Sequence, residues 1–295
     1  WHGCSRRSHR SSLDRSRRLV AVVFHKKEKI QLKTAEQILL MRAAGLVVAN
    51  ALQAVESAVA PGVTTKELDA IAHEVIRSSN ATPSFLGYHG YPAAICSSIN
   101  EEVVHGIPSD RALLDGDIIS IDCGAIVNGW HGDAAISVMV GNAKADVLKL
   151  SKVTEQSLWA GLGQARAGNR LSDIGHAVET TVRAAGTYGI LEDYVGHGIG
   201  TSMHMQPPIP NYGAAGRGPV LKVGMVLAIE PMVTLGSPVV EVLKDGWTVS
   251  TKDGSDASHW EHSIAVHDKG IWVLTAEDGG AAKLAPFGVK PVPLS

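Results

Sequence analysis

The chain has 295 residues, of which 45% are apolar and 19% are charged. A chain of this length and apolar content can bury a large core and is too apolar to remain disordered, so we expect a soluble globular protein. No stretch approaches the roughly 18 consecutive apolar residues of a membrane helix, and the basic start is not followed by the apolar core of a signal peptide. We therefore expect a cytoplasmic protein without a membrane partner.

The charge is divided unevenly along the chain. Residues 1–33 contain ten Lys and Arg residues against two acidic ones, which leaves 17 basic and 27 acidic residues in the rest. This leader is rich in Ser and Arg and lacks hydrophobic periodicity, so we expect it to be disordered. One interpretation is an electrostatic arm for RNA, with association to the ribosome, because Arg clusters contact phosphates without a fold. The favoured interpretation is an extended or truncated start, since residue 1 is Trp, and no specific nucleic-acid partner is expected.

Two helices are predicted after the leader, and each opens with a capping box. Thr34-Ala-Glu-Gln37 starts a long amphipathic helix that the pair Pro61-Gly62 stops. Thr64-Thr-Lys-Glu67 starts another, which ends before the helix-breaking run 78–83. Further helical patterns occur near 144–167 and 171–187.

Six apolar runs predict strands, at residues 117–122, 134–140, 225–235, 239–242, 263–266 and 271–275. A pair of helices followed by a hairpin occurs before residue 142 and again over 144–242. This repetition favours two similar halves that share one sheet. We expect a single mixed α and β domain over 34–275, followed by an irregular tail rich in Pro and Gly over 276–295.

Two acidic residues flank a predicted hairpin turn at Asn128-Gly129. In that hairpin Asp122 opposes Ala135 and Asp133 opposes Gly124, so the two carboxylates lie diagonally on one face. They repel each other there unless a cation lies between them. Asp122 also interrupts an apolar strand, where an ionised carboxylate without a partner is expensive to bury. The alternative is two unrelated acids, one at a strand and one in a turn.

Three more residues extend this candidate metal site. His197 has a glycine on each side, which leaves its imidazole unobstructed. Glu230 and Glu261 each interrupt or begin an apolar β run. The four carboxylates and one imidazole form an oxygen-rich donor set that suits two divalent ions such as Mn, Fe or Co, with Zn possible.

The chemistry of such a pair of ions predicts a hydrolase. Two ions about 3.5–4 Å apart can activate a water molecule and polarise a carbonyl group, which is the chemistry of amide or ester hydrolysis. The three cysteines have no Cys-x-x-Cys spacing, so a thiolate zinc site and a disulfide framework are both disfavoured.

Taken together, the motifs of the chain resemble type I methionine aminopeptidase. They are Gly87-Tyr-His-Gly-Tyr-Pro92, Ser98-Ile-Asn-Glu-Glu-Val-Val-His-Gly-Ile-Pro108, Ile121-Asp-Cys-Gly124, Gly132-Asp-Ala134, Gly196-His-Gly-Ile-Gly200, Ile229-Glu-Pro231 and Trp260-Glu-His262. The resemblance covers roughly residues 34–275 in the right order. It implies the α+β pita-bread fold, in which two pseudo-symmetric halves surround a central curved antiparallel sheet with helices outside.

The resemblance also implies an activity and a role for each site residue. The enzyme would be a monomer that removes the initiator methionine from nascent polypeptides by hydrolysis and favours a small second residue. Asp122 would bind one ion, His197 and Glu230 the other, and Asp133 and Glu261 both. His105 and His204 would contact the substrate and, with Glu230 as proton shuttle, form the catalytic set. The methionine side chain would lie in an apolar pocket formed by Phe85, Tyr88, Tyr91, Cys96, Met203 and Trp247.

Some features depart from the family pattern or leave alternatives open. Met-Gln-Pro follows His204 where many members have Glu-Glu-Pro, and Met203 stands where an aromatic residue is common, which puts the shape of the pocket in doubt. For His131, which shares the face of Asp133, we expect a supporting or structural role.

The enzymatic alternative is a prolidase-like or aminopeptidase P-like peptidase, disfavoured by the short segment before the first helix. The other alternative is a non-catalytic pita-bread protein that binds RNA or the ribosome.

Overall fold

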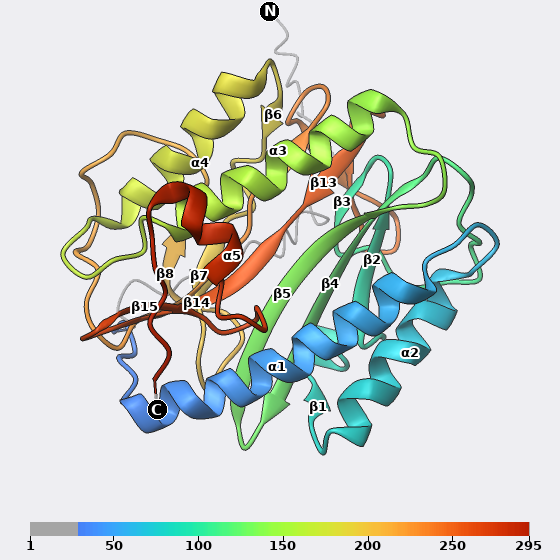
Figure 1. Ribbon diagram of the computed structural model, residues 1–295. Coiled ribbons are helices and arrows are strands. Elements are labelled where there is room, and N and C mark those ends of the chain that lie inside the picture. Colours follow the sequence, from blue (N-terminus) through green and yellow to red (C-terminus); the bar gives the residue numbers. More distant parts are fainter. Residues whose placement is uncertain (1–28, 295) are drawn as a thin grey trace, which may run out of the picture.

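One large antiparallel sheet carries the fold, as the computed structural model shows for residues 29–294 (Figure 1). Within these residues the sheet has nine strands, in the order β1-β4-β5-β14-β9-β7-β8, with β2 paired to β4 and β15 paired to β14. The strands are β1 Thr82–Pro83, β2 Ile95–Ile99, β4 Ile118–Val127, β5 Trp130–Met139, β7 Gly196–Gly198, β8 Met205–Ile209, β9 Val226–Ile229, β14 Glu261–His267 and β15 Gly270–Val273.

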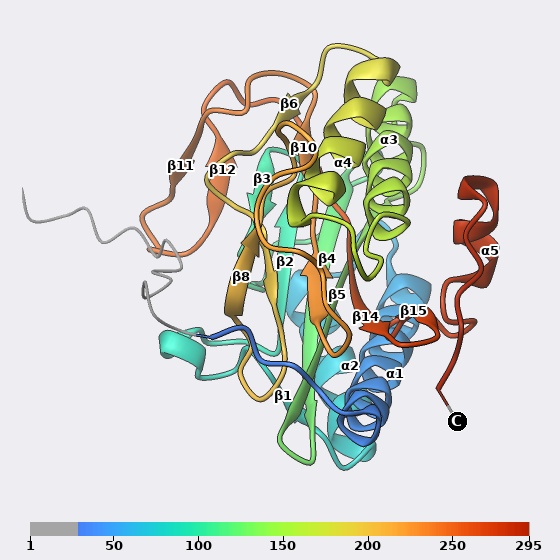
Figure 2. The ribbon, with the colours of Figure 1, turned by 90° about the vertical axis from the view of Figure 1, so that its left-hand side faces the viewer.

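Four long helices cover one face of this sheet (Figures 1 and 2). They are α1 Ala35–Ala58, α2 Thr65–Ser78, α3 Ala145–Leu162 and α4 Leu171–Ala185, close to the predicted ranges. Both predicted capping boxes are confirmed, because the side chains of Thr34 and Thr64 accept hydrogen bonds from the backbone N–H groups of Gln37 and Glu67. Two small sheets complete the structure: β13 (Ala257–His259) with β10 (Met232–Thr234) and β6 (Gly189–Ile190), and β11 (Val240–Val242) with β12 (Val249–Thr251) and β3 (Glu102–Val104).

The first hairpin has the predicted register. Asp122 pairs with Ala135 and Gly124 pairs with Asp133 along β4 and β5. The turn between them takes the left-handed backbone that this turn type needs, with φ of 50° at Asn128 and 80° at Gly129. The two carboxylates are therefore placed on one face of the sheet, as expected.

The second hairpin prediction is wrong. The run 225–235 is broken at Glu230-Pro231 into β9 and β10, because proline has no N–H to donate to a strand partner. β9 pairs with β7 and β14 in the large sheet, whereas residues 240–242 pair with β12 in a small one. The two halves of the sheet are thus β4 with β5 and β9 with β14, and they meet where β5 pairs with β14.

Both ends of the described chain pack more closely on the domain than predicted. Residues 1–28 of the leader lie outside the described part, but Lys33 N–H donates to Gly224 O at 2.7 Å and Gln31 Nε2 donates to Thr201 Oγ1 at 3.1 Å. The tail contains two short helical turns, α5 (Ala281–Leu284) and η2 (Ala285–Phe287), instead of being irregular throughout. Leu284 is buried against the core on the α3 side, and this contact holds the tail in place (Figure 2).

The first helix, α1, is long and apolar enough to cross a membrane. Half of its most apolar window is buried inside the protein, where α1 packs on β4 and β5. The contact with β5 is close because Gly132 has no side chain: a Cβ there would meet the backbone of Ala44 and Gly45 in α1. This burial is typical of a core helix.

Candidate metal centre

Five adjacent strands each bring one predicted metal ligand to the centre of the large sheet. In sheet order they are Asp122 on β4, Asp133 on β5, Glu261 on β14, Glu230 directly after β9 and His197 on β7. All five are largely buried, and the most exposed side chain, that of Glu230, is 13% accessible. Residues that are up to 139 positions apart in the sequence therefore form one polar cluster in the core.

The donor atoms of this cluster fall into two overlapping groups. Within each group the nitrogen and oxygen donors lie within 4.8 Å of one another: Asp133, His197 and Glu261 form one, and Glu230, His259 and Glu261 form the other. The Nε2 atom of His197 lies 3.7 Å from Asp133 Oδ2 and 3.6 Å from Glu230 Oε1. Asp122 lies outside both groups, yet it is close enough for its charge to raise the pKa of Asp133.

The electrostatics of the cluster are unfavourable without a cation. Burial raises the pKa of Asp122 to about 7. Burial and the neighbouring carboxylates hold the pKa values of Asp133, Glu230 and Glu261 well above their usual range. Among the described residues, one oxygen each of Asp122, Asp133 and Glu261 is buried without a hydrogen-bond partner. Since buried polar atoms are normally paired, these orphaned oxygens fit divalent cations, which also offset the repulsion.

His197 is oriented as a metal ligand. Its Nδ1–H donates to the backbone oxygen of Gly198 at 3.0 Å, which leaves the lone pair of Nε2 directed at the carboxylates. Burial lowers its pKa to about 4, so the imidazole is neutral at pH 7, the form that binds metals.

The two predicted substrate-contacting histidines lie beside the cluster. His204 Nδ1 is 2.8 Å from the hydroxyl oxygen of Tyr88, and its ring centroid is 4.5 Å from that of His197. Burial and the neighbouring imidazoles hold its pKa well below the usual range. His105, with a left-handed φ of 62°, packs edge-on against Tyr194 and Trp247, and burial lowers its pKa to about 4.

The six predicted pocket residues belong to a single apolar cluster. Phe85, Tyr91, Cys96 and Met203 are buried in it, and Tyr88 and Trp247 pack against it. The Tyr91 ring meets Phe85 and Trp247 edge-on, and its hydroxyl donates to the backbone oxygens of Ile95 and Gly106. Cys96 of β2 pairs with Asp122 of β4, so the apolar cluster directly adjoins the carboxylates.

His131 and His259 complete the set of buried imidazoles. His131 Nδ1 lies 3.1 Å from Ser84 Oγ, which agrees with a supporting role. His259 was not among the predicted site residues, although it stands two residues before Glu261 and so faces the same side of an extended chain. Burial lowers its pKa to about 3.

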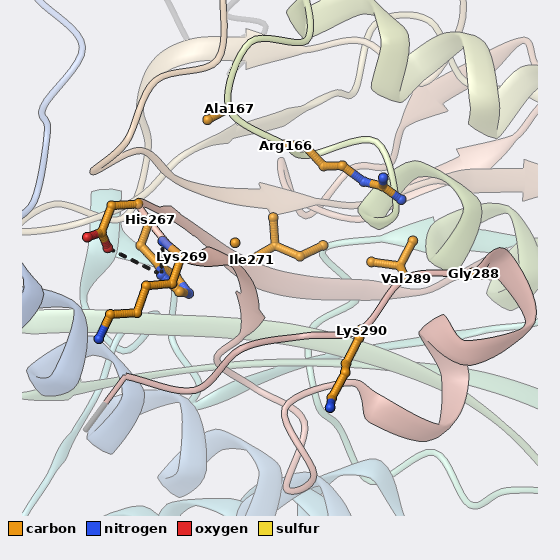
Figure 3. Close-up of a pocket in the computed structure, with 10 residues that line it drawn as sticks. Arg166, Ala167, His267, Lys269, Ile271, Gly288, Val289 and Lys290 are labelled. Carbon is orange, nitrogen blue, oxygen red and sulfur yellow. Dashed lines mark hydrogen bonds and ion pairs between the residues drawn. The ribbon is translucent and has the colours of Figure 1, made fainter.

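A separate pocket of about 320 Å³ lies at the turn between β14 and β15 (Figure 3). It is lined by Arg166, Ala167, His267, Asp268, Lys269, Gly270, Ile271, Gly288, Val289 and Lys290. Its basic side chains point in different directions, and Arg166 Nε donates to the backbone oxygen of Gly163 (Figure 3). None of the residues of the carboxylate cluster lines it, so this pocket does not contribute to the candidate metal centre.

The fold and the site together define a metallopeptidase of the pita-bread class. The chain matches metallopeptidase family M24 over residues 39–268 and belongs to that family. The methionine aminopeptidase 1 of Mycobacterium tuberculosis is 56% identical over 249 residues, which cover 82% of this chain and 94% of that protein. These matches confirm the resemblance seen in the sequence.

Solved structures of other proteins agree with this family assignment. The methionine aminopeptidase of Thermotoga maritima has a TM-score of 0.83 and 42% sequence identity, with 84% of this chain and 100% of that chain covered. The prolidase from Pyrococcus furiosus has a TM-score of 0.67 at 21% identity and covers 83% of this chain and 65% of that one, so this likeness concerns the fold alone. The chain is thus a hydrolase of the pita-bread fold with a buried site suited to divalent metal.

Proposed function

We propose that this chain is a methionine aminopeptidase that uses two divalent ions to remove the N-terminal methionine of newly made proteins. One observation carries the proposal: the carboxylate cluster and an apolar cluster of aromatic and sulfur-containing side chains adjoin each other where Cys96 pairs with Asp122. Such side chains pack well around a thioether. In this proposal the first side chain of a peptide packs among these apolar side chains while its scissile bond reaches the carboxylates.

The proposed ligand roles are those that the resemblance implies. Asp122 would hold one ion, His197 and Glu230 would hold the other, and Asp133 and Glu261 would bind both. Support comes from their burial and from the orphaned oxygens of Asp122, Asp133 and Glu261. Co, Mn, Fe and Zn all accept this donor set.

When bound, the ions supply Lewis-acid chemistry, which activates water and polarises the scissile carbonyl group. Glu230 accepts a proton from the attacking water and returns it to the leaving amide nitrogen. Proton transfer of this kind by a positioned carboxyl group is general acid–base catalysis.

The imidazoles position the substrate in this proposal. His204, which Tyr88 holds through Nδ1, donates from Nε2 to the carbonyl oxygen as it gains negative charge. His105 lies near the scissile nitrogen. The free amine of the first residue lies among the carboxylates, and because an internal peptide bond offers no such amine, cleavage is restricted to the N-terminus.

Several finer features belong to the same proposal. The names of the relatives support methionine as the first residue, and a small second residue is what the resemblance implies. We propose that the protein acts in the cytoplasm as a monomer on nascent N-termini. Contact with the ribosome through the basic leader concerns residues outside the described range.

A panel of three peptides tests the proposal against its alternatives. The metal-loaded protein should release methionine from Met-Ala-Ser and leave Leu-Ala-Ser and Ala-Pro-Ser intact. Preferential cleavage of Ala-Pro-Ser would replace the proposal with a prolidase-like function. No cleavage of any peptide would favour the non-catalytic scaffold.

A further inference from the structure

A second imidazole reaches the centre from outside the predicted ligand set. His259, the last residue of β13, is 1% exposed. Its Nε2 atom lies 3.7 Å from Glu230 Oε2 and 4.0 Å from Glu261 Oε2. His197 Nε2 lies 3.6 Å from the other oxygen of Glu230. Two imidazoles therefore flank Glu230, one at each carboxylate oxygen.

The distances fit shared binding of a cation better than a hydrogen bond. Nitrogen and oxygen atoms joined by a hydrogen bond lie about 2.7–3.2 Å apart, which is shorter than either distance to His259. Two ligands of one ion can be separated by at most twice a bond length of about 2.1 Å, or about 4.2 Å, and both distances fall within this limit. Within residues 29–294, His259 Nε2 has no hydrogen-bond partner, which is unusual for so deeply buried an atom.

The backbone of His259 is fixed by serines from the first half of the sheet. Its N–H lies 3.1 Å from both Ser120 Oγ and Ser137 Oγ, and Ser137 Oγ donates to its carbonyl oxygen at 3.0 Å. Ser120 and Ser137 also contact each other across β4 and β5. The imidazole therefore extends toward the carboxylates from a rigid support, which is how preorganised ligands are held.

We propose that His259 is a further metal ligand, whose Nε2 binds a divalent ion together with Glu230 and Glu261. This proposal rests on the metal centre of the proposed function and adds a sixth protein ligand to it. The two groups of donors, Asp133-His197-Glu261 and Glu230-His259-Glu261, then each contain one imidazole and share Glu261. Because Glu230 has one oxygen near each imidazole, it would then bind both ions instead of the His197 ion alone.

The proposal has a consequence for metal preference. Imidazole nitrogen favours Zn, Fe and similar ions, whereas carboxylate oxygen suits Mn and Mg. His259→Gln should therefore weaken Zn binding at least about tenfold, as the loss of even a supporting partner commonly does, and change Mn binding less. Competition with a chromogenic chelator measures both affinities. Equal affinities in the variant and the native protein would overturn the proposal.

The direct test is NMR of the full chain with ¹⁵N-labelled histidine, titrated with Zn²⁺. The Nε2 signals of His197 and His259 should both move to the position of metal-bound nitrogen. His259→Gln assigns one signal, and the matched control His262→Gln, whose imidazole bonds Thr275 instead, should leave both unchanged. A shift of His197 alone, with His259 Nε2 protonated, would overturn the proposal but keep the metal centre. If neither Nε2 signal shifted, both this proposal and the proposed metal centre would be contradicted.

Discussion

At the scale of single residues, the metal centre brings together buried carboxylates that repel one another when no cation is bound. Burial raises the pKa values of all four carboxylates, and the charges of neighbouring acids raise those of Asp133, Glu230 and Glu261 further. Burial of the imidazoles keeps these neutral. Such a site favours metal binding, but it lowers the stability of the metal-free protein.

The first prediction concerns Asp122→Asn in metal-free protein. The pKa of Asp122 in the folded state, about 7, lies above the value of about 3.9 expected for an unfolded chain. Between these values the folded state binds more protons than the unfolded state, so this carboxyl destabilises the protein progressively as pH rises from about 4 to about 7. The variant removes this penalty. In urea unfolding of chelator-treated protein, its advantage over the native chain should grow with pH, to a few kcal/mol near pH 7.

An advantage that stays constant with pH would contradict this account of Asp122. The metal-loaded proteins provide the control, since the sign of the effect should reverse there. With the cation bound, loss of a ligand should lower stability, because binding to the folded state alone stabilises it.

The second prediction concerns Tyr88 and His204. His204→Ala removes a donor to the reacting carbonyl oxygen and should lower kcat by about 10²–10³-fold. Tyr88→Phe removes only the hydroxyl that holds the ring at 2.8 Å, so kcat should fall by a smaller factor. Tyr188→Phe, in a separate apolar cluster that contains none of the site residues, is the control. If Tyr88→Phe left kcat unchanged, the hydroxyl would not orient His204.

Residue types and motifs were sufficient to predict Asp122, Asp133, His197, Glu230 and Glu261 as one group, and the structure brings them together. Their roles in binding metal remain predictions. His259 was missed although it stands two residues before Glu261, because its approach to Glu230 depends on the pairing of β13 with β10, which places it opposite Met232. In the sequence alone, a lone histidine near an acid does not indicate a ligand.

At the scale of elements, the site depends on the close packing of α1 on the first hairpin. Local signals were enough to predict the helices and the β4-β5 register, since capping boxes and an Asn-Gly turn act over a few residues. The partners of β9 could not be predicted, because pairing with β14 depends on contacts between residues more than 30 positions apart.

The third prediction tests this packing. A Cβ at Gly132 would lie 2.6–2.9 Å from backbone atoms of Ala44 and Gly45, which cannot rotate away. Gly132→Ala should therefore push α1 off β5 and cost about 1–3 kcal/mol of unfolding free energy. Gly163→Ala is the matched control, since its Cβ would meet its nearest atoms at 3.4–3.5 Å, an ordinary contact. Equal urea midpoints for the two variants would contradict the close contact.

At the scale of the whole molecule, two half-sheets meet along β5 and β14, and the ligands lie on both sides of this junction. Neither half contains a complete ligand set, so the centre exists only when the halves are joined. The helices pack on one face of the sheet, and the tail is anchored beside α3 (Figures 1 and 2). The family match spans residues 39–268 and thus includes both halves.

The measurement that tests the central claim most directly is release of free methionine from Met-Ala-Ser by protein stripped of metal and then reloaded with Mn, Fe, Co or Zn. We predict no release without metal, full activity as about two equivalents of the preferred ion are added, and almost none from Glu230→Ala under any condition. Release by the stripped protein, or normal turnover by Glu230→Ala, would contradict the account.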